Sequence, residues 1–187
     1  MAISNVQGLF VRELCGIYDA EYRFLDGQVK MVHRATDHEL QRSIENHIAQ
    51  TRQHIENLER LFREFGEEPR RETNEAAQGL VSEAERDMGE AQGDALRDCL
   101  IVAAVIKVEH FEIGSYRGLL TGARLVMGQQ SIAVDLLEAN LQQEEETAQI
   151  TEQSAETLLQ KAMQVEMPEA EGLVDKIKRV KDRLGDR

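Results

Sequence analysis

Apolar residues recur every three to four positions along almost the whole chain, which is the repeat of an amphipathic α-helix. The pattern predicts four long helices, over residues 5–34, 37–65, 95–125 and 131–165. Thr36 and Glu39 have the spacing of a capping box at the start of the second helix, and Asp94 is the expected cap of the third. Gly66 and Gly128 are expected to end the second and third helices.

A polar stretch, residues 66–94, separates the second long helix from the third. It is too long for a tight turn, and a short helix is predicted inside it over residues 74–88. Two helical hairpins joined by a long crossover are typical of ferritin-like bundles, so the predicted fold is an all-α, ferritin-like four-helix bundle over residues 1–166. Residues 167–187 form a C-terminal tail in this interpretation, with a short amphipathic helix over residues 168–184.

Composition and charge narrow the class of protein. A hydrophobic share of 41% is too high for a disordered acidic chain, and a formal charge of −13 disfavours binding to nucleic acid or to an anionic membrane surface. The longest apolar run, residues 99–106, is too short to span a bilayer. Cys15 and Cys99 lie in apolar helical patterns and are interpreted as reduced thiols, so a cytoplasmic location is expected.

Each predicted long helix carries a carboxylate or an imidazole on its apolar face, near the middle of its length. Any one of these residues alone could be a surface group or a histidine satisfied within the core. Their coincidence at one level of all four helices favours a shared site instead. The residues are Glu21 in the first helix, His47 and His54 in the second, Glu109 and Glu112 in the third, and Glu144 in the fourth.

No lysine or arginine occupies a matching inward position, so these buried carboxylates need another source of positive charge. Two divalent metal ions would supply it. A set of ligands rich in oxygen with some imidazole suits iron or manganese better than structural zinc. Motifs of other chemistries, such as a glycine-rich phosphate loop, CxxC or HExxH, do not occur in the sequence.

Four segments of the chain resemble the YciE/YciF-type ferritin-like family. They contain Glu13-Leu14-x-x-Ile17-Tyr18-x-Ala20-Glu21, the stretch from His47 through Thr51 to His54, Val108-Glu109-His110-Phe111-Glu112-Ile113, and Leu136-Leu137 through Leu141 to Glu144 and Thr147. The resemblance covers about residues 3–154. It implies a bundle of the rubrerythrin and ferritin type, forming a homodimer and linked to bacterial stress responses.

The resemblance also implies a set of di-iron ligands, namely Glu21, His54, Glu109, Glu112 and Glu144. Glu21 and Glu144 would be terminal ligands, and Glu109 and Glu112 bridging or terminal ones. The chain departs from the family at Gln50 and Gln143, where many relatives carry glutamate. A neutral amide binds a metal more weakly, so these two residues are expected to be weak ligands or groups behind the ligands.

Three hypotheses about function follow. The leading one is a di-iron protein that handles iron, oxygen or peroxide under stress, with His47 and His110 orienting the ligands and Tyr18 or Tyr116 bonded to one of them. An oxidase or peroxidase type of activity stays open, and no catalytic residue is assigned. The second is a non-catalytic stress protein with a vestigial metal site, and the third an assembly module whose tail docks on another chain.

Overall fold

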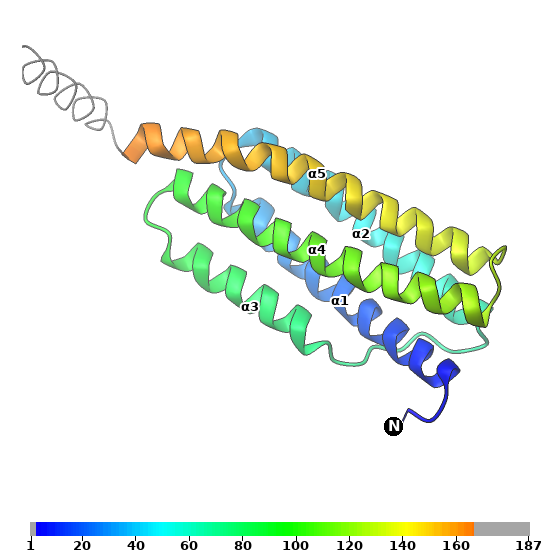
Figure 1. Cartoon of the computed structure of the whole chain (residues 1–187). Helices are drawn as coiled ribbons and strands as arrows, with labels where there is room; N and C mark the ends of the chain where they lie inside the picture. The colour runs from blue at the N-terminus through cyan, green and yellow to red at the C-terminus, as the bar shows by residue number, and fades with distance from the viewer. Residues whose placement is uncertain (1–2, 167–187) are drawn as a thin grey trace, which may run out of the picture.

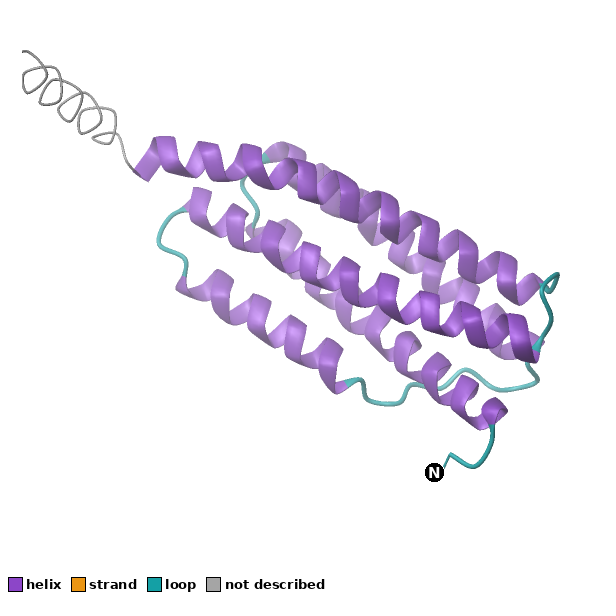
Figure 2. Cartoon of the chain, viewed as in Figure 1, coloured by secondary structure: helices purple, strands orange, loops and turns teal. Residues whose placement is uncertain are grey.

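The computed structural model describes residues 3–166, which form a bundle of helices (Figure 1). Four long helices lie side by side: α1 (Val6–Arg34), α2 (His38–Glu64), α4 (Asp94–Val126) and α5 (Ile132–Glu166). The shorter α3 (Glu75–Glu90) packs outside the bundle against α1 and α4. Figure 2 shows helices and loops but no strand in this part of the chain, which confirms the predicted all-α class.

The connections give the bundle its topology. α1 and α2 form one antiparallel hairpin and α4 and α5 the other, while the crossover with α3 runs back along the bundle (Figure 1). As a result α2 and α4 run in the same direction, as the ferritin-like topology requires. The predicted helix over residues 168–184 lies outside the described residues. Within residues 3–166, none of the helices has an apolar stretch long enough to cross a membrane.

The predicted capping box at the start of α2 is wrong. Asp37 caps this helix, because its side chain accepts hydrogen bonds from the backbone N–H groups of Glu39 and Leu40. Thr36 instead donates to Asp98 of α4, through its backbone N–H at 2.8 Å and its hydroxyl at 2.7 Å. A partner on another helix therefore outcompetes the local motif, and ties the α1–α2 turn to α4.

Three other predicted helix ends, at Gly66, Asp94 and Gly128, can be compared with the structure. Gly66 and Gly128 have positive φ angles of 77° and 94°, which confirms both as the residues at which helices end. Asp94 is the first residue of α4 rather than its cap. Gly93, with φ 110°, occupies the cap position and offers no side-chain hydrogen bond.

The apolar core consists of two clusters at opposite ends of the bundle. One cluster surrounds Leu14, Leu58 and Tyr116, and the other surrounds Met31, Ile44 and Ile101. The buried residues Glu21, Glu109 and Glu144 lie between these clusters along their helices. The core thus seals the middle of the bundle from water on both sides, where the sequence places its carboxylates.

Candidate metal centre

Six acidic and histidine side chains converge in the middle of the bundle. Their spacing along each helix sets this, because residues three, four or seven apart share one face. α2 contributes two of them seven residues apart, and α4 contributes two that are three apart. All six are buried: Glu21 on α1, His47 and His54 on α2, Glu109 and Glu112 on α4, and Glu144 on α5.

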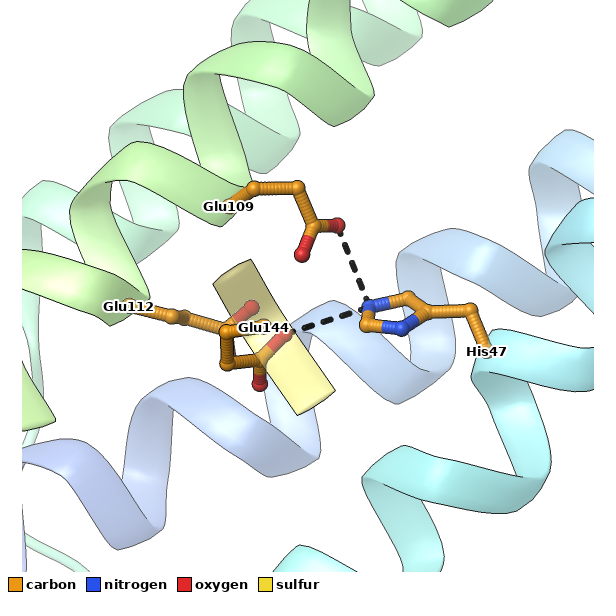
Figure 3. A group of neighbouring side chains, drawn as sticks. All are labelled: His47, Glu109, Glu112 and Glu144. Atoms are coloured by element: carbon orange, nitrogen blue, oxygen red, sulfur yellow. Dashed lines mark ion pairs between the residues drawn. The ribbon is translucent and has the colours of Figure 1, made fainter. Parts of the chain in front are cut away.

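Four of these side chains form a first group, made of His47, Glu109, Glu112 and Glu144 (Figure 3). One ligand atom from each lies within 4.8 Å of the others. Nε2 of His47 is 3.2 Å from a carboxylate oxygen of Glu109 and 3.9 Å from one of Glu144. The group therefore surrounds a space in which one ion could touch all four side chains.

Glu21, His54 and Glu144 form a second group within the same distance limit. Nδ1 of His54 lies 2.9 Å from one oxygen of Glu144 and 3.5 Å from an oxygen of Glu21. Glu144 belongs to both groups, so its carboxylate lies between two adjacent positions for an ion. Glu21 and His54 complete the second position from α1 and α2.

Within the described part of the chain, most of the atoms that face these positions have no hydrogen-bond partner outside the two groups, and inside the groups the closest contact is the 2.9 Å one between His54 and Glu144. The atoms without an outside partner include both carboxylate oxygens of Glu109, Glu112 and Glu144, one oxygen of Glu21, Nε2 of His47 and Nδ1 of His54. Unpartnered buried polar atoms are rare because each costs about 1–3 kcal/mol. In residues 3–166, Glu21, Glu109 and Glu144 form ion pairs with histidines rather than with lysine or arginine, and Glu112 forms none. The donor set thus fits divalent cations.

In both His47 and His54, the ring nitrogen that points away from the carboxylates contacts the side chain of a glutamine. Nε2 of His54 is 2.8 Å from the amide oxygen of Gln143, and Nδ1 of His47 is 3.4 Å from that of Gln50. An amide oxygen only accepts, so each of these ring nitrogens carries the proton. The opposite ring nitrogen is then the one directed at the carboxylates, and the glutamines orient the rings for metal binding.

A hydrogen-bonded chain holds Glu21 from behind. The Tyr116 hydroxyl donates to one oxygen of Glu21, and the Asn140 side-chain amide donates to that hydroxyl at 3.0 Å. Asn57 donates in turn to the Asn140 carbonyl oxygen at 2.7 Å. The oxygen of Glu21 that accepts from Tyr116 is also the one 3.5 Å from Nδ1 of His54, and the other oxygen has no hydrogen-bond partner among the described residues.

Burial dominates the acid–base behaviour of this centre. It raises the pKa values of the Glu109 and Glu112 carboxyls well above the usual range, and the neighbouring Glu144 raises them further. Burial alone would lower the pKa of His54, but Glu21 and Glu144 raise it to about 10. Without a cation, the centre therefore retains protons on carboxyls and on His54, and an arriving metal ion would displace them.

The structure brings together all five residues of the expected ligand set. His47, expected to be a weak ligand or a group behind the ligands, belongs to the first group itself. The structure corrects the expectation for His110, whose side chain is 57% exposed and lies 2.7 Å from Glu152 on the surface. Tyr116 contacts a candidate ligand as expected, whereas Tyr18 donates to Glu59.

Asn140 is not among the residues predicted for the site, although the sequence contains a signal for it. Asn140 lies four residues before Glu144 and therefore on the same buried face of α5. Gln50 and Gln143 were singled out, but only as replacements for glutamate. Their contacts with the histidine rings depend on how the helices are placed beside one another.

Comparisons with known proteins agree with this architecture. The profile of a family described as "Domain of unknown function (DUF892)" matches residues 5–182, beyond residue 154, where the expected resemblance ends. YciF of Escherichia coli K12 is 28% identical over 148 residues, which are 79% of this chain and 88% of that protein.

Two solved structures are also similar. The E. coli stress protein YciF superposes with a TM-score of 0.79 at 26% identity, covering 84% of this chain and 99% of that one. YcfI from Rhodopseudomonas palustris, provisionally called a structural protein, superposes with a TM-score of 0.77 at 29% identity, covering 80% and 94%. These likenesses extend over nearly the whole of each relative.

Proposed function

This chain belongs to the DUF892 family, and from the geometry of its core we propose that it binds two iron ions and uses them to handle dioxygen or peroxide. The observation that carries the proposal is the set of buried, unpartnered carboxylate and imidazole atoms that face one another from four helices. Four carboxylates carry four negative charges when ionised, and two divalent ions would balance them.

In this proposal Glu144, which belongs to both groups, would serve both ions, instead of being the terminal ligand that the resemblance implies. His47, Glu109 and Glu112 would hold one ion with it, and Glu21 and His54 would hold the other. Iron would supply one-electron chemistry that no side chain of this core offers. The residues of the chain hold the ions, exclude water through the two apolar clusters, and keep both imidazoles in the binding tautomer.

Titration with ferrous iron without oxygen tests the proposal. We expect about two ions per chain, as in carboxylate di-metal bundles. Adding hydrogen peroxide or dioxygen to the loaded protein should then change its visible absorbance. Binding of less than about one ion per chain would contradict the proposal. Parallel titrations with manganese and zinc would identify the preferred metal.

A non-catalytic role is the second candidate, because the similar protein YcfI is provisionally called structural. In that case iron would be absent or bound without consequence, and the bundle itself would be the functional unit. Iron that binds but gives no spectral response to peroxide or dioxygen would favour this role. The description of YciF as a stress protein is compatible with both candidates.

Gln143 offers a test of the hydrogen bonds behind the ligands. Replacing Gln143 by alanine removes the acceptor for Nε2 of His54, so the ring loses its fixed orientation. We expect the affinity for the ion held by His54 to fall about 10- to 100-fold. Gln142→Ala is the matched control, because Gln142 is exposed and bonds to Glu146. Equal affinities for both variants, measured by competition with a chelator, would argue against this role.

A further inference from the structure

A small cavity lies beside the first group of candidate ligands. Its volume is about 20 Å³, and His47 and Glu109 form part of its wall, whereas Glu21 and His54 do not. A void of this size has room for one water-sized molecule. The two positions for an ion are therefore unequal, because the one at His47 borders free space.

The second position is closed by its neighbours. Tyr116 packs edge-on against the ring of His54, with 6.0 Å between ring centroids, and its hydroxyl donates to Glu21. Gln143 covers the remaining nitrogen of His54. All three side chains that would hold this ion are fully buried.

Apolar side chains form most of the cavity wall. They include Met31, Ile44, Val105 and Val108, together with the backbone of Gly27. This apolar part of the wall offers no compensation for the lost hydration of an ion. A small uncharged molecule loses little hydration on entering, so the apolar part of the wall favours one.

The cavity and a groove on the surface share two of their lining residues. Ser43 and Thr147 line the cavity, and the same two side chains line a surface groove between α2 and α5 of about 410 Å³. Thr147 donates to the amide oxygen of Gln50, which also meets His47. Two small side chains thus border both the surface groove and the cavity.

We propose that this cavity binds a small uncharged molecule of the size of dioxygen and delivers it to the ion at His47 and Glu109, while the ion at Glu21 and His54 stays closed. The inference rests on the proposed function, since it requires bound metal. It adds which ion reacts, from which side the molecule arrives, and which side chains control its access. Gly27 and Val105 are the positions at which the size of the cavity can be changed, because neither belongs to the ligand set.

Nitric oxide is a suitable probe, because it is a neutral diatomic that gives ferrous iron a visible band and an electron paramagnetic resonance signal. Val105→Ile adds one methylene to the cavity wall, and Gly27→Ala adds a methyl group whose nearest neighbour, Val81, would be 3.6 Å away. Val105→Ala enlarges the cavity. Val102→Ile is the matched control, because Val102 is buried on the same helix but is not part of this wall.

We expect one nitrosyl iron per chain in the wild type. Binding should be at least about tenfold slower in Val105→Ile and Gly27→Ala, because a filled void in a close-packed core leaves no room. It should be faster in Val105→Ala and unchanged in Val102→Ile. Azide, a small anion, should give no spectral change.

The outcomes separate this inference from the proposed function. Equal rates in all the Val105 variants at normal iron content would overturn the cavity as the route, as would equal reaction of both irons or of azide. A wild-type chain that takes up no ferrous iron would instead overturn the proposed function, and the inference with it. Iron content measured for each variant before the nitric oxide is added tells these failures apart.

Discussion

Replacing Glu144 by glutamine is expected to abolish high-affinity binding of both metal ions, whereas Glu21→Gln should remove only one. Glu144 is common to both groups of candidate ligands, and Glu21 belongs to one of them. Losing the shared carboxylate also removes one negative charge from both positions at once. Metal analysis after anaerobic loading with ferrous iron measures the stoichiometry, with about two, one and no ions expected for the wild type, Glu21→Gln and Glu144→Gln.

Glu145, the residue that follows Glu144, supplies the control for this experiment. Glu145 is exposed and pairs with Arg117 on the surface, so Glu145→Gln changes the same charge without touching the centre. It should bind as much iron as the wild type. If Glu144→Gln and Glu21→Gln lost the same amount of iron, Glu144 would not be a bridge.

Replacing Glu112 by glutamine is expected to stabilise the metal-free protein at neutral pH. Burial raises the pKa of the Glu112 carboxyl well above its usual value, and neighbouring carboxylates, Glu144 first among them, raise it further. Folding must then protonate a group that is ionised in the unfolded chain, and a neutral amide avoids that cost. Removing such a buried charge is often neutral or stabilising.

The pH dependence of this gain has a definite sign. A raised pKa in the folded state gives stability that is complete below the unfolded pKa, near 4.5, and is lost as pH rises toward the folded value. The advantage of Glu112→Gln should therefore vanish near pH 4.5 and grow by up to about 1.4 kcal/mol per pH unit above it. Urea unfolding of both proteins with a chelator present, at several pH values, measures this difference.

With metal bound, we expect the wild type to be more stable than Glu112→Gln. An ion that binds only the folded wild type stabilises it by about 2.7 kcal/mol at a free concentration 100 times its dissociation constant. The variant lacks one ligand and should gain less. Glu145→Gln should follow the wild type under both conditions. A metal-free Glu112→Gln protein less stable than the wild type at pH 7 would show that the wild-type carboxyl is satisfied in a way the structure does not contain.

The sequence predicted the elements of this fold and the inward polar residues with little help from tertiary contacts. The repeat of apolar residues identifies the buried face of each helix, and Glu21, Glu109 and Glu144 interrupt that face. His47 and His54 are seven residues apart and so share a face. The prediction that His110 orients the ligands is wrong. His110 follows Glu109 by one residue, which turns its side chain by about 100° around the helix axis and toward solvent.

Only the tertiary structure decided how these residues combine. The Thr36–Asp98 contact, the sharing of Glu144 between two groups, and the pairing of Gln143 with His54 each join helices that are far apart in sequence. Periodicity fixes the direction of a side chain around its own helix, but not the shift and rotation of one helix against another. Those depend on the packing of all the facing side chains together, so the residues at the centre were readable from the sequence, while their division into two unequal positions was not.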